Sequence, residues 1–260
     1  MSATTPAALE CRKLTVSVPG RTLVENLGMD VVNGEFLAVL GQNGAGKSLT
    51  LHTLAGLRRA ERGEVRLLGS SLEATQRREI ARNLALLPQY SEDVFPATVF
   101  DTVLIGRHPH VGLLQWESRE DRRIASEALR EMDLASMAER DVGTLSGGER
   151  RRLAIAQTLT QTPAVYLLDE PTNHLDPQHQ LDVLRIFRRQ AMSGATVIAS
   201  LHDVNLAARY ADRCLLLFGD GRWELGSTDS VLSARRLTEL YSTPMEAIAW
   251  RDTRLFVAAG

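Results

Sequence analysis

Four short, largely hydrophobic runs are the clearest pattern along this chain. They are residues Phe36–Leu40, Ala164–Leu168, Ala195–Ser200 and Leu215–Phe218. A strand that is covered on both faces of a parallel sheet is hydrophobic throughout and lacks the alternation of a half-exposed strand. A stripe at helical spacing lies between the second and third runs, formed by Leu181, Leu184, Phe187 and Ala191. Together these patterns predict an α/β core built on a mostly parallel sheet.

The first part of the chain has a different pattern, in which hydrophobic and polar residues alternate. The alternating hydrophobic positions are Leu14, Val16 and Val18, and then Val65 and Leu67. Turn signals occur at Pro19-Gly20 and at Asn33-Gly34. Alternation with turn signals nearby predicts a small antiparallel sheet beside the core.

The middle of the chain, from about Pro96 to Leu159, is predicted to be mostly helical. Hydrophobic positions recur there at helical spacing, at Ile124, Ala125, Ala128, Leu129 and Met132. We interpret this stripe as a packing face. The tail after about Gly219 shows only short, mixed patterns.

Length and charge bound the class of protein. The 260 residues suffice for one large domain with a sizeable core. The formal net charge of -2 gives no electrostatic footprint for a nucleic acid. The local basic cluster Arg150-Arg151-Arg152 is interpreted as a solvated helix face.

The cysteines and the chain start exclude further classes. Cys11 and Cys214 lie far apart and give neither a disulfide framework nor a zinc spacing, and Cys214 is expected to be a small buried side chain. Residues 1–6 lack the features of a signal peptide. No hydrophobic run approaches the length of a membrane span. We therefore expect a soluble, intracellular protein, unless a partner holds it at a membrane.

The stretch after the first hydrophobic run carries the strongest candidate chemistry. It reads Gly41, Gln42, Asn43, Gly44, Ala45, Gly46, Lys47 and Ser48, followed by Leu49, and fits the phosphate-loop pattern G-x-x-x-x-G-K-[ST]. Glycines let successive backbone N–H groups point at phosphate oxygens, and the helix start adds its positive dipole end. Lys47 supplies a charge for the β- and γ-phosphates, and the Ser48 hydroxyl can bind Mg²⁺. The alternative is an ordinary strand–helix loop.

An acidic pair, Asp169 and Glu170, follows the second hydrophobic run. Strands of an open parallel sheet deliver their C-terminal ends to the edge where ligands bind. In P-loop nucleotide triphosphatases an Asp in this place holds Mg²⁺, usually through water. Glu170 can then orient or deprotonate an attacking water. The alternative is a surface acid pair after a core strand.

A third motif, Leu145-Ser146-Gly147-Gly148-Glu149, lies between the phosphate loop and the acidic pair. With it, the chain resembles the ATP-binding subunit of ABC (ATP-binding cassette) transporters, of which this motif is the signature. Further segments resemble the Q-loop at Gln89, the D-loop at Asn173-His174-Leu175-Asp176 and the switch histidine at His202. The resemblance runs from about Leu9 to about Ala247, and its motifs occur in the order that the family requires.

The resemblance implies a fold and a domain organisation. The fold is α/β, a P-loop NTPase of ABC type with a mostly parallel core sheet, an N-terminal antiparallel β subdomain and an inserted α-helical subdomain. Residues 1–260 form a single ABC ATPase domain in this interpretation. About 1–95 and 160–260 belong to a RecA-like core with the antiparallel β subdomain, and about 96–159 form the helical subdomain with the signature motif.

The resemblance also implies the cofactors ATP and Mg²⁺. The implied metal ligands are Ser48, Gln89 and Asp169. Glu170 is implied as the catalytic base, and the assisting residues are Gln89, His202 and Lys47. Taken alone, Gln89 is an unremarkable surface amide and His202 a structural histidine at a strand end.

The signature residues imply a chamber made of two chains. By resemblance, Ser146, Gly147 and Gly148 cap the γ-phosphate of an ATP that is held by a second copy of the chain, and Asp176 links the two sites. Taken alone, Ser146 is a helix cap, and Asp176 is a helix N-cap before Pro177.

Three features favour an importer. The chain is a free-standing ATPase without a membrane span, and the sequence Asn173-His174-Leu175-Asp176 is common in importers. The segment Thr98–His110 resembles the one after the Q-loop in importers of ferric siderophores, haem and cobalamin. We interpret this segment as lining a groove for a permease helix, because His108 and His110 alone are too few ligands for a metal site.

The implied partners are a second copy, two copies of a transmembrane permease and, indirectly, a periplasmic or surface substrate-binding protein, with no nucleic acid. The implied location is the cytoplasmic face of the inner membrane, as a peripheral subunit. The sequence does not name the cargo. Two alternatives stay open: an ATPase of another class of ABC transporter, and a non-transport ABC ATPase. Non-transport members carry either two cassettes in one chain or long coiled coils, and this sequence shows neither.

Two positions depart from the family pattern. An aromatic residue that stacks on adenine is often found near Val18, which can offer only apolar contact. Recognition of the base is therefore weaker or comes from another residue. Leu49 replaces the commoner Thr after Ser48, which leaves the metal-binding hydroxyl intact.

Overall fold

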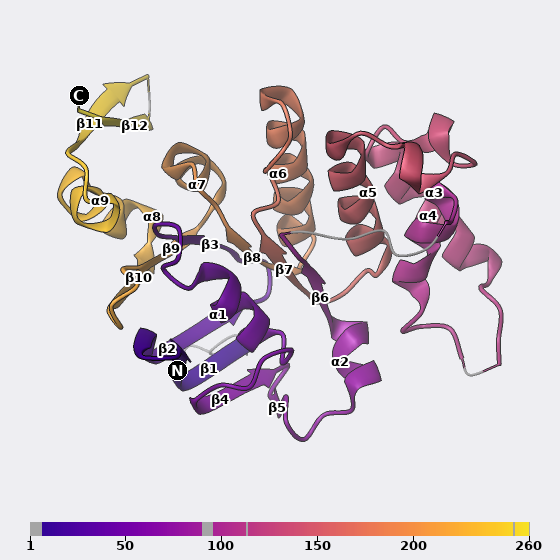
Figure 1. Ribbon diagram of the computed structural model, residues 1–260, viewed down its shortest axis with the longest axis horizontal. Coiled ribbons are helices and arrows are strands. Elements are labelled where there is room, and N and C mark those ends of the chain that lie inside the picture. Colours follow the sequence, from indigo (N-terminus) through magenta and orange to yellow (C-terminus); the bar gives the residue numbers. More distant parts are fainter. Residues whose placement is uncertain (1–6, 90–95, 113, 252, 260) are drawn as a thin grey trace.

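A six-stranded sheet runs through the middle of the computed structural model, which describes residues 7–89, 96–112, 114–251 and 253–259 (Figure 1). Its strands, in spatial order, are β10 (Trp223–Ser227), β9 (Arg213–Leu217), β3 (Phe36–Leu40), β8 (Thr196–Ser200), β7 (Val165–Asp169) and β6 (Leu84–Leu87). Neighbouring strands are parallel, except that β10 is antiparallel to β9. The four hydrophobic runs form β3, β7, β8 and β9, so the prediction of a mostly parallel core sheet is confirmed.

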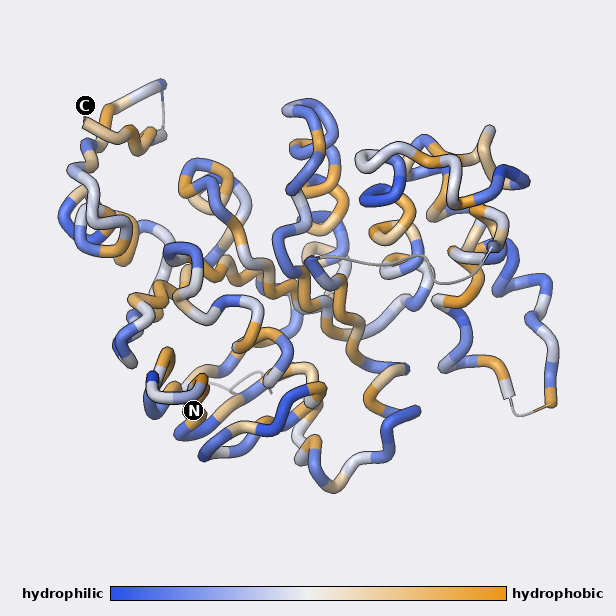
Figure 2. Tube along the Cα trace, in the orientation of Figure 1, coloured by the Kyte–Doolittle hydropathy of each residue, from blue (hydrophilic) through white to orange (hydrophobic). Residues whose placement is uncertain are grey.

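Both faces of this sheet are covered. In β3, Phe36, Ala38 and Leu40 join one buried cluster, whereas Leu37 and Val39 join a second cluster on the opposite face. Helices α5 to α7 cover the first face, and α1 with the N-terminal strands covers the second (Figure 1). Figure 2 shows hydrophobic residues concentrated along the central strands. This two-sided burial is the reason that the core strands lack polar alternation.

A four-stranded antiparallel sheet packs beside the core. Its order is β2 (Arg21–Val32), β1 (Ala7–Val18), β4 (Arg62–Leu67) and β5 (Ser70–Ser71). β1 pairs antiparallel with both β2 and β4. Gly20 and Gly34 take left-handed φ angles of 76° and 84° in the turns that the sequence marks. The predicted antiparallel sheet is therefore confirmed.

Residues 96–160 are mostly helical, as predicted. The elements are α3 (Val99–Leu104), η1 (Ile105–Arg107), α4 (Arg119–Glu131), η2 (Ala135–Met137), η3 (Val142–Thr144) and α5 (Gly147–Thr160). In α4, a capping box between Ser118 and Asp121 starts the helix, and Ala125 and Leu129 are buried against the core. The other helices are α1 (Lys47–Leu54), α2 (Arg77–Asn83), α6 (Pro177–Met192), α7 (Val204–Tyr210), α8 (Thr228–Val231) and α9 (Ala234–Tyr241).

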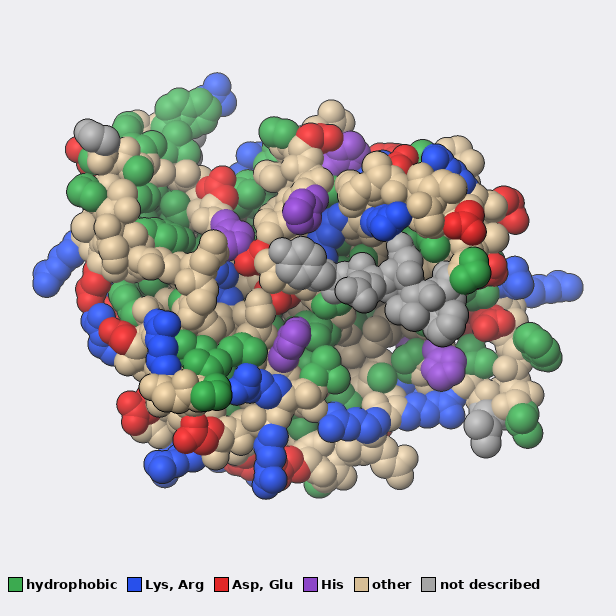
Figure 3. Space-filling model, in the orientation of Figure 1, with side chains coloured by type: hydrophobic (Ala, Val, Ile, Leu, Met, Phe, Trp, Pro, Cys, Tyr) green, Lys and Arg blue, Asp and Glu red, His purple; other side chains and the backbone are tan. Residues whose placement is uncertain are grey.

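The tail ends in a hairpin of β11 (Met245–Trp250) and β12 (Thr253–Ala258) that projects from the body of the molecule (Figure 1). Asn205 of α7 holds it through two hydrogen bonds with the main chain of Phe256, at 2.8 and 3.1 Å. Ile248 and Trp250 are exposed, and hydrophobic side chains gather on this tail in Figure 3. The sequence indicated only short mixed structure here.

Two further expectations concern buried and terminal residues. Cys214 is buried in β9, and Cys11 is buried in β1, as free thiols. Burial raises the pKa of Cys11 to about 12 and that of Cys214 to about 11. The signal-peptide interpretation concerns residues 1–6, which lie outside the described residues. Within the described ranges, the helices are too short or too polar to cross a bilayer.

Candidate functional site

A cavity of about 560 Å³ opens beside the loop between β3 and α1. It is lined by Val18, Arg21, Leu23, Asn43, Gly44, Gly46, Lys47, Ser48, Leu49, Gln89, Glu170, Asn173 and His202. These residues come from the antiparallel sheet, from the phosphate-loop motif and from the ends of three parallel strands. The topology therefore brings together segments that are far apart in the sequence.

The phosphate-loop motif has the setting that the sequence predicted. β3 leads into the loop, and α1 begins at Lys47. Gly46, the N-cap of α1, has a φ of 100°, and a Cβ atom there would lie 3.0 Å from Cβ of Leu23. Only glycine satisfies both conditions, so the sequence pattern has a steric cause at this position.

Lys47 is held in place by the loop itself. Its Nζ donates to the carbonyl oxygens of Gly41 and Gln42, at 2.8 and 3.2 Å. The residue is 5% exposed. Burial lowers the pKa of the Lys47 ammonium, although the carboxylates of Glu170 and Asp169 act in the opposite direction.

Asp169 is the last residue of β7 and is buried. Its Oδ1 accepts a hydrogen bond of 2.7 Å from Oγ of Ser200. Within the described residues, Oδ2 is also buried but has no hydrogen-bond partner. A buried carboxylate oxygen without a partner is unusual, and hard divalent cations prefer such oxygen ligands. The arrangement therefore fits a metal site at the phosphate loop.

The carboxylate of Glu170 is contacted by two other predicted site residues and by one residue that was not predicted. Its carboxylate accepts from Nε2 of Gln89 at 2.7 Å and lies 2.6 Å from Nε2 of His202. Nδ2 of Asn173 also donates to it. The prediction did not include Asn173 as a site residue, although it lies in the D-loop segment that the sequence had singled out.

The backbone of Glu170 is strained. Its φ is 50°, in the left-handed region that residues other than glycine rarely adopt. Its N–H donates to Oγ of Ser200 at 2.8 Å, so the hydroxyl of Ser200 contacts both members of the acidic pair. Strain of this kind persists where surrounding contacts fix the residue, and it clusters at functional sites.

Arg151 corrects one sequence interpretation. The cluster at residues 150–152 was expected to be a solvated helix face, but Arg151 is only 6% exposed. Its guanidinium donates to the main-chain carbonyls of Asp169 and Glu170, at 2.7 Å each. The signal was available in helical spacing, because Arg151 lies one turn before Ile155, which is fully buried in the same helix.

The signature turn lies apart from the cavity lining. Ser146 is the N-cap of α5 and forms a capping box with Glu149. Ser146 and Gly147 are exposed, and a Cβ at Gly148 would lie 3.4 Å from the carbonyl oxygen of His174. The turn thus borders the segment 173–176. The helix-cap interpretation of Ser146 is confirmed, and its contact with a second chain's nucleotide stays a prediction.

Asp176 is also a helix cap, as its sequence context before Pro177 indicated. It accepts from the backbone N–H of His179 at 3.0 Å and starts α6. Hydrogen bonds from the backbone and then the side chain of His179 lower the pKa of Asp176. Asp176 is exposed and is not among the residues that line the cavity. Its link between two sites stays a prediction.

The cavity lining contains a residue that the sequence did not single out. Arg21, at the start of β2, lines the cavity beside Val18. Its Nε and Nη2 donate to the carbonyl oxygen of Gly219, at 2.9 and 2.6 Å, which fixes the plane of the guanidinium. A planar cation is therefore present where the sequence lacks an aromatic residue.

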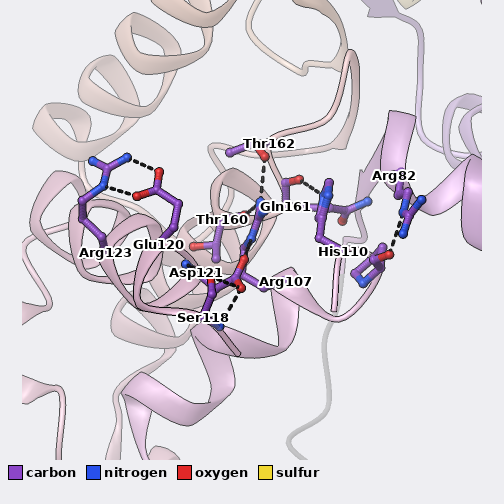
Figure 4. A network of polar contacts seen from close by, with 11 residues as sticks. Arg82, Arg107, His110, Ser118, Glu120, Asp121, Arg123, Thr160, Gln161 and Thr162 are labelled. Atoms are coloured by element: carbon purple, nitrogen blue, oxygen red, sulfur yellow. Dashed lines mark hydrogen bonds and ion pairs between the residues drawn. The ribbon is translucent and has the colours of Figure 1, made fainter. Parts of the chain in front are cut away.

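The segment Thr98–His110 is anchored by a polar network (Figure 4). Nε of Arg107 pairs with Oδ1 of Asp121 at 2.7 Å, and Nη1 donates to the Thr160 carbonyl at 3.0 Å. Nε2 of His110 lies 2.9 Å from the Gln161 carbonyl oxygen, and burial lowers the pKa of His110. His110 thus takes part in fixing this segment to the end of α5.

Three features together define a P-loop nucleotide triphosphatase: the glycine-rich loop, the buried Lys47 and the acidic pair at the end of β7. The comparison with known families makes this assignment specific. The sequence profile described as "ABC transporter" matches residues 24–173, which is more than half of the chain. The chain therefore belongs to the ABC transporter family, as the signature motif indicated. The ATP-binding domain of this family binds ATP and is an ATPase coupled to transport.

Relatives and solved structures agree with this assignment. The hemin import ATP-binding protein HmuV of Gloeobacter violaceus is 44% identical over 232 residues, covering 86% of this chain and 84% of the relative. The achromobactin transport ATP-binding protein CbrD of Dickeya dadantii is 38% identical, with the same coverage. A metal-chelate type ABC transporter solved in an inward-facing conformation matches with a TM-score of 0.84 at 30% identity, covering 98% of both chains. The similarity to this structure confirms the predicted fold class.

Proposed function

We propose that this chain hydrolyses ATP to power the import of an iron chelate, either haem or a ferric siderophore, through a membrane permease. The names of the similar proteins, which concern hemin and achromobactin, support this cargo class. Cobalamin stays an alternative that rests on the resemblance of residues 98–110. The observation that carries the proposal is the convergence of Gln89, Glu170 and His202 at the phosphate-loop cavity.

The phosphates of ATP would lie against the backbone of the loop at 41–48. Lys47 is already placed there and carries the charge that the β- and γ-phosphates require. We propose that Ser48, Gln89 and Asp169 hold Mg²⁺, and the buried, unpartnered Oδ2 of Asp169 supports this. Bound there, Mg²⁺ would neutralise charge on the phosphate oxygens.

Glu170 is proposed as the group that takes the proton of the attacking water. Gln89 and His202 contact its two sides, so they fix the direction of the carboxylate. Phosphoryl transfer needs mainly positioning and charge stabilisation, and a carboxylate held by several donors is well suited to this task.

The base of the nucleotide is proposed to lie at the far end of the cavity. Val18 and Leu23 supply apolar contact there. The guanidinium of Arg21, fixed by Gly219, supplies a planar cation that can stack on a purine ring. This would answer the open question of what contacts adenine in a chain without the usual aromatic residue.

The second half of the chamber is proposed to come from a second copy of the chain. Ser146 and Gly147 are exposed at the start of α5, where backbone N–H groups are available to an anion. Asp176 lies at the start of the neighbouring α6. We propose the division into a core, about residues 1–95 and 160–260, and a helical subdomain, about 96–159, on the arrangement of the elements in Figure 1.

Two permease copies are proposed as the membrane partners, with a periplasmic or surface substrate-binding protein as an indirect one. The anchored segment Thr98–His110 would line the groove that receives a permease helix. Held in this way, the chain would lie at the cytoplasmic face of the membrane.

The first experiment is ATP hydrolysis by the purified chain and by Lys47→Ala. Removing one preorganised charge typically costs about 3–4 kcal/mol of transition-state stabilisation, so we expect at least a roughly hundredfold loss. Near-normal turnover of the variant would contradict the assignment. Transport of haem, a ferric siderophore and cobalamin into proteoliposomes with the permease would then identify the cargo, and isolation as a soluble nucleic-acid complex would contradict transport.

A further inference from the structure

One buried side chain joins three segments of the proposed ATPase site. The guanidinium of Arg151 donates through Nη1 to the carbonyl oxygens of Pro88 and Gln89, at 2.6 and 3.3 Å. Through Nη2 it donates to the carbonyls of Asp169 and Glu170, at 2.7 Å each. A single side chain on α5 therefore holds the residues that follow β6 and the end of β7.

Among the described residues, this charged group has no carboxylate as a direct hydrogen-bond partner. The four acceptors are main-chain carbonyls, and the side chain is buried. Burial lowers the pKa of Arg151 to about 10, against the opposing influence of Asp169 and Glu170, so the guanidinium stays protonated at neutral pH. A planar fork with several fixed donors suits such a cluster of carbonyls better than an ammonium does.

The contact with Glu170 lies at the strained point of the site. The backbone of Glu170 is in the left-handed region, and Arg151 binds the carbonyl of Glu170 and that of the residue before it. A rare backbone conformation persists only when neighbouring contacts fix it. Arg151 therefore helps to determine where the carboxylate of Glu170 points.

Arg151 also holds Gln89, which donates a hydrogen bond to Glu170. The side-chain amide of Gln89 donates to Glu170 at 2.7 Å, while the main-chain carbonyl of Gln89 accepts from Arg151 at 3.3 Å. Both partners of the Gln89–Glu170 contact are thus attached to one guanidinium. A shift of α5 would move the two partners together.

The position of Arg151 in α5 gives this attachment a direction. Ser146, the N-cap of α5, precedes Arg151 by five residues, which is about 7.5 Å along a helix. A helix transmits a displacement of its first turn to a side chain one turn further on, because its backbone is hydrogen-bonded throughout. A displacement of the signature turn by a binding partner would therefore change the position of Glu170.

We propose that Arg151 is a positioning residue that aligns Gln89 and Glu170 for hydrolysis and couples their geometry to the signature turn. Arg151 does not line the cavity, and it would act through Gln89 and Glu170, which do. The inference rests on the proposed ATPase function, and it adds a residue that neither the motifs nor the family resemblance assigns.

The test compares Arg151→Ala, which removes the guanidinium, with Arg151→Lys, which keeps the charge but loses the fork. Arg130→Ala is the matched control, because Arg130 is an exposed arginine of α4 whose side chain, in the part of the chain that the structure describes, donates to Ser126 of its own helix. The measurements are kcat and KM for ATP, binding of a fluorescent ATP analogue and the thermal midpoint of unfolding.

We expect kcat to fall at least about tenfold in both Arg151 variants, since displacements of about 1 Å at a reacting group can cost about a hundredfold. KM and analogue binding should stay near the wild-type values, because Arg151 does not line the cavity. Added guanidinium ion should restore part of the activity of Arg151→Ala, whereas an equal concentration of urea should not.

The outcomes separate this inference from the proposed function. Folded variants with wild-type kcat would overturn it, and so would equal rescue by urea. Failure of both variants to fold would also overturn it, because Arg151 would then be a stability residue. Absence of hydrolysis in the wild-type chain would instead overturn the proposed function.

Discussion

The acidic corner around Glu170 and the signature turn around Ser146 are built in opposite ways. Glu170 is buried, and its carboxylate is contacted by side chains from three separate segments of the chain. Ser146 is exposed, and its cap contacts come from its own turn, through Glu149. Contacts within one chain hold the carboxylate of Glu170, whereas the signature turn is exposed at the surface. A nucleotide site shared between two chains would need one buried part and one exposed part of this kind.

The largest effect is expected at the corner, from Glu170→Gln. The amide keeps the shape of the side chain but cannot take a proton, so hydrolysis should fall about 10²- to 10⁴-fold. ATP binding should persist, because the phosphate loop is unchanged. Size-exclusion chromatography with ATP should show a stable dimer. A variant that stays monomeric with ATP would count against Glu170 as the base.

A smaller loss of ATP hydrolysis is expected from a substitution in the signature turn, Gly147→Asp. A Cβ atom at Gly147 would have no heavy atom within 4 Å in the described chain, so the folded monomer should accommodate the change. If the turn faces the γ-phosphate of a partner, the added negative charge should lower hydrolysis by at least about tenfold and weaken ATP-dependent dimerisation. Binding of ATP to the monomer should be unaffected.

A mixing experiment sharpens the same comparison. Gly147→Asp keeps Lys47, and Lys47→Ala keeps the signature turn, so a mixed dimer contains one intact composite site. Mixing the two impaired variants should therefore raise ATP hydrolysis above that of either variant alone. If the corner and the turn of one chain served the same nucleotide, mixing would give no such rise.

A moderate effect of pH on folding stability is expected in the helical region that carries the signature turn, through Asp121 of α4. Burial raises the pKa of Asp121, but hydrogen bonds from Ser118 and Arg107 outweigh it and lower the pKa to about 2, from an ordinary 3.8. The ionised carboxylate therefore stabilises the fold above pH 3.8, and this contribution is lost as the pH falls through about 2.

Urea unfolding can measure this contribution. The destabilisation caused by Asp121→Asn should be largest near neutral pH and should shrink in acid. Asp182→Asn is the control, because Asp182 forms an exposed pair with Arg185. An Asp121→Asn effect that is the same at every pH would mean that the charge of Asp121 does not contribute.

The smallest effect is expected at the base end of the cavity. Arg21→Ala would remove the proposed cation–π contact with the base, worth about 0.5–1 kcal/mol, so the Kd for ATP should rise about two- to fivefold. Arg12→Ala, at an exposed arginine of β1 that pairs with Glu10, should leave the Kd unchanged. Equal effects of the two substitutions would indicate a general loss of charge and not a specific contact.

Hydrophobic pattern predicted the core of the fold well, because two-sided burial leaves an unambiguous signal in β3, β7, β8 and β9. It missed β6 (Leu84–Leu87), which is only four residues long and begins directly after Asn83, the last residue of α2. It also missed the hairpin of β11 and β12. The exposed strand β11 has little contrast between its two faces, and no glycine or proline marks the turn near Arg251.

The site was predictable where a motif fixes local geometry and less so where a contact is made over a distance. Lys47, Gln89, Glu170 and His202 were predicted from motifs, and the structure brings them to one cavity. Arg151 was misinterpreted, because three consecutive arginines suggest a solvated face when the packing of the helix is unknown. Arg21 carried no signal, since its partner Gly219 is 198 positions away.

The hydrogen bonds of Lys47 to the loop carbonyls have a consequence for ligand capture. Confining a free lysine side chain costs about 1.5–2 kcal/mol in lost rotamers. Here that loss has occurred when the loop folds, since Gly41 and Gln42 already confine the ammonium group. An arriving triphosphate meets a cation that needs only to exchange acceptors, so the loop should gain affinity through rigidity that exists before any ligand enters.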